Sequence, residues 1–181
     1  MSKALVIIKS MGIGDLCILI SNIHAISKHN SQPVTILAQK NTRAKEVLMH
    51  DPHIKEVIEL DEKEIRGFFN IIKILKYKKF DTCYIYSDSI RFFLISKLSN
   101  IKKIFHYRFF SKKGKNFFRT AKEFTENILK KEINFQSKIY FDKNEMENNK
   151  KKYNILNNTK NIVCGISASG PTVRWDIKNY I

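Results

Sequence analysis

The sequence of 181 residues is poor in several residue types, and each scarcity narrows the possibilities. It has three cysteines (Cys17, Cys83 and Cys164), which stand far apart without CxxC spacing. This arrangement favours free thiols over a disulfide framework or a zinc site. Its apolar runs are short, such as Ala4–Ile8, whereas a membrane-spanning helix needs about 20 apolar residues. The absence of such a run excludes a membrane-spanning class.

The start of the chain also lacks the features of a secretory leader. A lysine and five apolar residues lead to Lys9 and a polar loop, which is too short for a signal peptide. Hydrophobic residues make up 43% of the chain, enough for the core of one domain or slightly more. We therefore expect a globular, cytoplasmic protein.

Acidic residues are scarce relative to basic ones. Lys and Arg total 33 and Asp and Glu total 17, giving a net charge of +16, which attracts polyanions. Arg91–Arg119 has nine basic residues and no acidic one, with eight aromatic residues interleaved. This segment suits single-stranded nucleic acid or an anionic membrane surface. Alternatively, most of its aromatic residues are core positions of a helix and a strand.

The sequence alternates short apolar runs with segments of helical periodicity, which predicts parallel strands joined by crossovers. We therefore expect an α/β fold with a doubly wound, Rossmann-like parallel sheet over residues 1–157, and a second domain beginning at 158–181. The predicted strands are residues 3–9, 34–38, 57–60, 80–86, 101–107, 138–141 and 161–166. The predicted helices are residues 16–26, 42–49, 61–75, 89–98, 118–131 and 145–156.

In such sheets, ligands bind outside the carboxyl ends of the strands. The loops there are residues 10–15, 87–91 and 106–115. The first one resembles the start of a dinucleotide-binding G-x-G-x-x-G motif, but Cys17 occupies the third glycine position. Gln39 and Lys40 stand where a nicotinamide site has an acidic residue, so that alternative is disfavoured.

Asp15 stands at the start of the first predicted helix. It either caps that helix or points into the crevice as a general base toward a hydroxyl. Gly12 and Gly14 would allow the backbone to approach a bulky substrate closely.

The histidines show no metal-ligand spacing. We expect His24, His29, His50 and His53 at the surface or at helix ends, and His106 at the end of a strand. We predict no metal site and no separate cofactor.

Several segments, in order along the chain, resemble glycosyltransferase family 9, the lipopolysaccharide heptosyltransferase family. Ala4–Asp15 reads ALVIIKSMGIGD, and Val34–Asp61 contains the run DPHIKEVI. Phe80-Asp81 with Ser87–Ser99 continues the pattern, and Gly165–Trp175 reads GISASGPTVRW. The resemblance departs at Val173 and Asp176, where the family has a basic residue and a proline.

The resemblance implies a two-domain GT-B enzyme that transfers a sugar with inversion from a nucleotide-sugar, ADP-heptose in this family, to a lipopolysaccharide core or other phosphorylated glycan. Asp15 falls on the family's catalytic aspartate. The donor-phosphate loop falls on Ser167, Ser169, Gly170, Thr172 and Arg174. The candidate acceptor-binding residues at the strand ends are Ser10, Gly12, Gly14, Ser87, Arg91 and His106.

Further expectations follow for the chain's partners and extent. We expect peripheral contact with an anionic membrane and no specific nucleic acid. One strand and a loop after residue 158 cannot bury a core, so a fragment or truncated form is expected. The alternative hypothesis is a non-catalytic basic module that binds nucleic acid or membrane.

Overall fold

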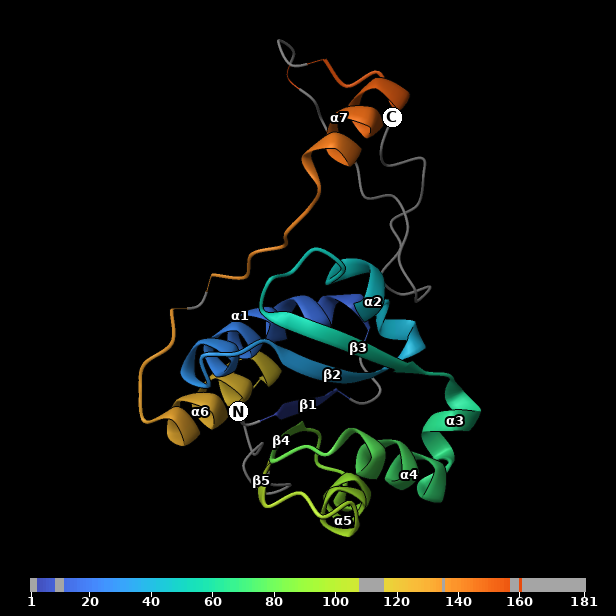
Figure 1. Ribbon diagram of the computed structural model, residues 1–181. Helices are drawn as coiled ribbons and strands as arrows, with labels where there is room; N and C mark the ends of the chain where they lie inside the picture. Colours follow the sequence, from blue (N-terminus) through green and yellow to red (C-terminus); the bar gives the residue numbers. More distant parts are fainter. Residues whose placement is uncertain (1–2, 9–11, 108–115, 135, 157–159, 161–181) are drawn as a thin grey trace, which may run out of the picture. The chain divides into compact units, whose positions relative to one another are not determined.

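The fold is built on a five-stranded parallel sheet with strand order β3-β2-β1-β4-β5 (Figure 1). The computed structural model describes residues 3–8, 12–107, 116–134, 136–156 and 160. Within these residues the strands are β1 (Ala4–Ile8), β2 (Val34–Gln39), β3 (Ile54–Leu60), β4 (Thr82–Tyr86) and β5 (Lys103–His106). The predicted doubly wound parallel sheet is confirmed.

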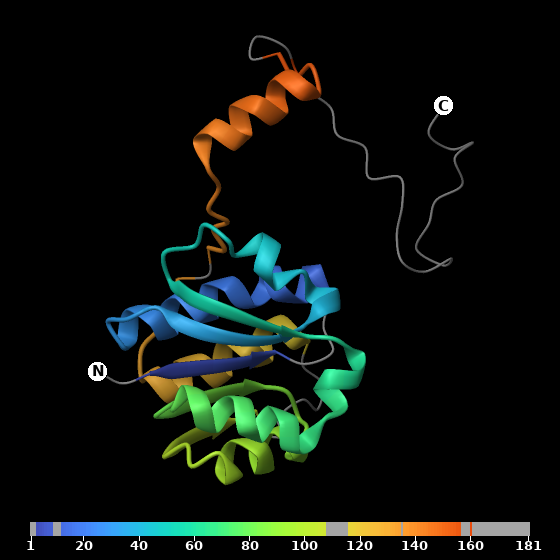
Figure 2. The same ribbon diagram turned by 45° about the vertical axis from the view of Figure 1, so that its right-hand side comes forward.

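Helices cover both faces of this sheet (Figure 2). One face is covered by α1 (Ile13–His29), by α2 (Ala44–Val47) after a 3-10 turn at Lys40–Thr42, and by α6 (Phe117–Leu129). The other face is covered by α3 (Glu62–Arg66), α4 (Phe68–Lys78) and α5 (Ile90–Leu98).

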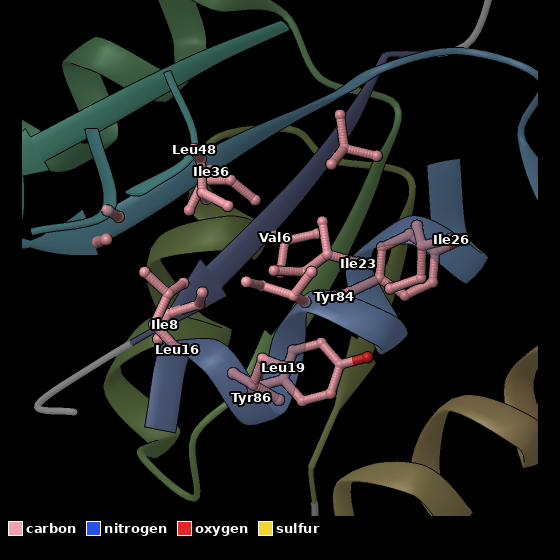
Figure 3. Packing of buried hydrophobic residues seen from close by; sticks show 14 of the residues in the cluster. Val6, Ile8, Leu16, Leu19, Ile23, Ile26, Ile36, Leu48, Tyr84 and Tyr86 are labelled. Atoms are coloured by element: carbon pink, nitrogen blue, oxygen red, sulfur yellow. The ribbon is translucent and has the colours of Figure 1, made fainter. Parts of the chain in front are cut away.

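Burial of β1 on both faces explains its continuous apolar sequence. Successive side chains of a strand point to opposite faces. Accordingly Val6 and Ile8 pack against α1, whereas Leu5 and Ile7 pack on the α3–α5 side. Figure 3 shows the first of these layers, in which Leu16, Leu19 and Ile23 of α1 meet β1. Each fully buried Leu or Ile side chain contributes about 1.5–3 kcal/mol.

The helix predicted over residues 61–75 is in fact two helices. Its start is correct: Glu64 N–H donates to Asp61 Oδ1 at 2.7 Å, and Asp61 N–H donates to Glu64 Oε2 at 2.8 Å. The helix then breaks at Gly67, whose ψ of 87° is not helical. A Cβ there would lie 3.1 Å from the Glu64 carbonyl oxygen, so the break suits glycine.

The strand predicted at residues 138–141 is wrong, since these residues have no regular secondary structure. The Ser137 hydroxyl donates to the Cys17 carbonyl at 2.7 Å, and the Tyr140 ring lies beside His24. The segment is therefore held against α1 by side chains, where no strand edge offers backbone partners.

The chain divides into two compact units, Met1–Phe141 and Asp142–Ile181. In the second unit, α7 (Lys143–Lys152) begins at Asp142, whose side chain accepts the N–H groups of Asn144 and Glu145. The predicted boundary between residues 157 and 158 lies outside the described residues. Among the helices that the structure describes, none is long and apolar enough to cross a membrane.

Candidate functional site

The candidate site lies where two neighbouring strands lead to opposite faces of the sheet. β1 and β4 are paired, with Ile8 opposite Tyr86 at their carboxyl ends. β1 leads into α1 on one face, and β4 leads into α5 on the other. Loops diverge at such a switch point and leave a crevice, which is where open α/β sheets bind ligands. The loops after β1 and β4 therefore form the first candidate site.

Asp15 is in the first turn of α1, and its side chain is half-buried. Its Oδ2 accepts the Gly12 N–H at 3.2 Å, so it does cap the helix. Gly12 and Gly14 are exposed, and a Cβ built on either meets no atom within 4 Å. Within the described residues no lysine or arginine is ion-paired with Asp15. The carboxylate thus caps the helix and still reaches solvent.

The loop after β4 meets the end of β5. Ser87 is buried, and its hydroxyl oxygen accepts the Ser89 N–H at 3.2 Å. His106 lies opposite Ile85 in the β4–β5 register. Burial lowers the pKa of His106, while hydrogen bonds to the backbone of Ser89 and Ser87 and the charge of Asp88 oppose that shift. The predicted pair Ser87 and His106 is therefore brought together.

Asp88 is a residue of this loop that the sequence analysis did not single out. It is half-buried and follows directly after Ser87. It places a second carboxylate at the carboxyl end of β4, next to the strand that leads to Asp15. Its signal in the sequence was an acidic residue two positions after a buried strand, in a chain with few acidic residues.

Arg91 is in the first turn of α5, with its guanidinium carbon 5.8 Å from the centre of the Phe92 ring. Its Nη2 is buried and has no hydrogen-bond partner in the part of the chain that the structure describes. Buried donors in proteins are generally satisfied, and a guanidinium matches carboxylate and phosphate groups. Arg91 therefore has an unused donor that suits an anionic group.

Other predicted site residues fall outside the described residues. They are Ser10 of the first loop and the donor-phosphate set Ser167, Ser169, Gly170, Thr172 and Arg174.

The expectation for His24 is wrong, because this residue is buried. Its Nε2 lies 2.6 Å from Oδ2 of Asp51, and its ring centre lies 4.5 Å from that of His53. Burial, His24 and Lys28 lower the pKa of His53, whereas Asp51 raises it. The cluster lies at the start of β2, where the His53 carbonyl accepts the Val34 N–H. Asp15 follows the carboxyl end of the parallel strand β1, so the cluster is at the opposite end of the sheet from Asp15.

Within the described residues there is no group of three or more His, Cys, Asp or Glu side chains that could hold a metal ion. We interpret the cluster as structural.

The aromatic residues of Arg91–Arg119 belong mainly to the core. Phe92 and Tyr107 are buried, and Phe93 and Phe105 are partly buried in the two core clusters. Phe118 is exposed, while Phe109 and Phe110 lie outside the described residues. The described aromatic residues therefore favour the core interpretation over a stacking surface.

Comparison with known proteins adds to this geometry. The sequence matches no family model and no curated protein. Among solved structures, it matches a family 9 glycosyltransferase from Veillonella parvula DSM 2008 with a TM-score of 0.78, over 99% of this chain. The fold is similar to that of part of this family 9 glycosyltransferase. The sequence identity is 12%, and the match covers 58% of the Veillonella chain.

A second match is the E. coli ADP-heptose lipopolysaccharide heptosyltransferase II, with a TM-score of 0.61 and 13% identity. It covers 86% of this chain and 51% of the E. coli chain. The chain thus spans a little over half the length of these structures. The predicted resemblance to glycosyltransferase family 9 is confirmed at the level of fold.

Proposed function

We propose that this chain is the acceptor-binding half of a GT-B glycosyltransferase. The enzyme would transfer a sugar from a nucleotide-sugar to a phosphorylated glycan acceptor such as a lipopolysaccharide core. ADP-heptose is the first donor to test. The observation that carries the proposal is the position of Asp15. It is a solvent-accessible carboxylate beside the switch point of a family 9 fold.

In the proposed reaction, Asp15 acts as the general base. Its carboxylate takes the proton from an acceptor hydroxyl while that oxygen attacks the anomeric carbon of the donor sugar. The bond from the anomeric carbon to the phosphate oxygen of the donor breaks, and the nucleoside diphosphate leaves with the electron pair. Attack from the face opposite the leaving group inverts the configuration.

The remaining site residues are assigned to the two substrates. Arg91, with its unused buried donor, would hold a phosphate of the acceptor. The pKa of His106 is lowered, so its neutral ring can exchange a hydrogen bond with acceptor hydroxyls near Ser87. Ser10, Gly12 and Gly14 would frame the acceptor next to Asp15.

The donor phosphates are assigned to the loop carrying Ser167, Ser169, Gly170, Thr172 and Arg174. Backbone N–H groups and hydroxyls can cradle a pyrophosphate, and Arg174 would stabilise its developing charge. A lipid-anchored acceptor also calls for contact between the enzyme and an anionic membrane at the cytoplasmic face.

The test is the substitution Asp15→Asn, which preserves shape and removes the base. In an enzyme that carries this half together with a donor-binding half, with ADP-heptose and a lipopolysaccharide core acceptor, we expect the rate of transfer to fall about 10²–10⁴-fold. Acceptor binding, measured by calorimetry, should change little, because the substitution removes only the proton acceptor.

A matched control is Asp61→Asn, because Asp61 also caps a helix but at the edge strand β3, two strands from β1. This variant should transfer sugar at the original rate. Transfer by Asp15→Asn at the rate of the control would refute the assignment of the base. Salt-sensitive binding to DNA or RNA with no transfer would instead support the non-catalytic basic module.

A further inference from the structure

The outer side of α5 presents a stripe of exposed aliphatic side chains. Ile90, Leu94 and Leu98 follow one another at four-residue spacing and are 44–69% exposed. Residues four apart lie on the same side of a helix, so these three form one continuous stripe. The inward side of α5 is occupied by Phe92 and Ile95, which are buried. The core of the domain therefore does not account for the outer stripe.

The neighbouring helix extends this surface. α4 and α5 pack against each other on the same face of the sheet, as Figures 1 and 2 show. On α4, Phe69 is 82% exposed and Tyr77 is equally open to solvent, whereas Ile71, Ile72 and Leu75 point inward. Two adjacent helices thus expose large apolar side chains on their solvent sides.

The charges on this surface have a single sign. Neither α4 nor α5 contains an acidic residue. Lys73 and Lys76 of α4 and Lys97 of α5 are exposed among the apolar side chains. The α4–α5 surface is defined here as Phe69, Lys73, Lys76, Tyr77, Ile90, Leu94, Lys97 and Leu98.

We propose that the α4–α5 surface docks onto an anionic lipid bilayer. The aliphatic stripe would enter the boundary between headgroups and acyl chains, while the lysines contact lipid phosphates. This proposal deepens the membrane contact of the proposed function by naming the residues that make it. Its evidence, however, does not involve the transfer site.

Two other occupants fit these residues less well. Bases of a nucleic acid could stack on Phe69 and Tyr77 of α4, but the aliphatic stripe on α5 would then stay in contact with water. A second copy of the chain would bring Lys73, Lys76 and Lys97 against like charges. Anionic lipid satisfies the apolar and the basic side chains together.

The test is co-sedimentation of the chain with vesicles of phosphatidylcholine containing phosphatidylglycerol, against vesicles of phosphatidylcholine alone. We expect binding that depends on the anionic lipid and weakens with salt. Leu94→Glu should reduce binding roughly tenfold or more, since it removes an inserted side chain and adds a repelled charge. Lys97→Ala should reduce it roughly fivefold.

The matched control is Met49→Glu, which makes the same change in charge at an exposed apolar residue following α2, on the other face of the sheet. It should bind vesicles nearly as well as the original chain. Equal losses for Leu94→Glu and Met49→Glu would overturn the assignment of the surface. Equal binding to both kinds of vesicle would overturn the choice of anionic lipid.

Competing partners give distinct results. RNA binding that Leu94→Glu abolishes while vesicle binding persists would overturn the proposal in favour of nucleic acid. A dimer in solution that Leu94→Glu dissociates, without loss of vesicle binding, would overturn it in favour of a second copy. Vesicle binding needs no sugar transfer, so an active Asp15→Asn variant would refute the proposed base without affecting this result.

Discussion

Replacing Asp51 with alanine is expected to lower the free energy of unfolding by about 2–5 kcal/mol, because two groups lose their hydrogen-bond acceptor at a cost of about 1–3 kcal/mol each. The Asp51 side chain is 1% exposed, and its Oδ2 lies 2.6 Å from Nε2 of His24. Its Oδ1 also accepts the His53 backbone N–H at 2.9 Å. Alanine removes both acceptors, and the His24 side chain, which is 10% exposed, loses its partner in a largely buried position.

A contact of equal length at the surface supplies the control. Glu56 Oε1 lies 2.6 Å from Nζ of Lys78, but the glutamate side chain is 44% exposed. Water and salt screen such a pair, so Glu56→Ala should change the free energy of unfolding by about 0–1 kcal/mol. The comparison isolates burial, since the two contact distances are the same.

Urea denaturation followed by circular dichroism measures both variants. Domains of this kind have a free energy of unfolding of about 5–15 kcal/mol, so the loss in Asp51→Ala is a large share of the total. It should shift the urea concentration at the midpoint strongly without changing the dependence of the free energy on urea concentration. Asp51→Asn keeps the shape and an acceptor for the His53 N–H, and should lie between Asp51→Ala and the original chain. Similar effects of Asp51→Ala and Glu56→Ala would refute the argument from burial.

Three further predictions concern buried polar groups. Burial lowers the pKa of His53 from its ordinary 6.5, so the free energy of unfolding should fall as the pH drops below about 6.5. The fall should be less steep in His53→Gln. Urea titrations at pH 7.5 and 5.5 that give the same change in the free energy of unfolding for both chains would contradict this. Burial raises the pKa of Cys83 to about 12, which keeps its thiol protonated and unreactive. Iodoacetamide should therefore label half-buried Cys17 but not Cys83 in the folded chain. Peptide mapping that finds early modification of Cys83 would contradict this prediction. Tyr86→Phe removes a hydroxyl that lies 2.5 Å from the hydroxyl of Thr125 in the core. It should lower the free energy of unfolding by about 1–2 kcal/mol. An unchanged thermal stability of this variant would contradict the prediction.

The sheet was predictable because its strands are buried on both faces. Ala4–Ile8 and Cys83–Tyr86 are continuous apolar or aromatic runs, and such runs between helical segments indicate central parallel strands. The two errors in the elements have local causes. Gly67 adopts a non-helical ψ within an otherwise periodic segment, and residues 138–141 contain Ile, Tyr and Phe, which favour a strand, but lie against a helix.

The candidate site was predictable in outline and not in its contacts. The rule that ligands lie at the carboxyl ends of strands identified the loops of Asp15, Ser87 and His106. Contacts such as that of His106 with the backbone at Ser87 and Ser89 depend on strand register, which periodicity does not specify. The burial of His24 was missed for a related reason, because its partner Asp51 is 27 residues away.

The central position of β1 has a consequence for the order in which the domain assembles. β1 precedes the other four described strands of the sheet in the chain, but one of its two neighbours is β4, and Lys3 N–H donates to Asp81 Oδ2 across 78 residues of chain. Until β4 has emerged from the ribosome, one edge of β1 has only solvent or another chain to pair with. Such distant pairing slows folding, so a nascent chain that ends before Thr82 should depend most on chaperones.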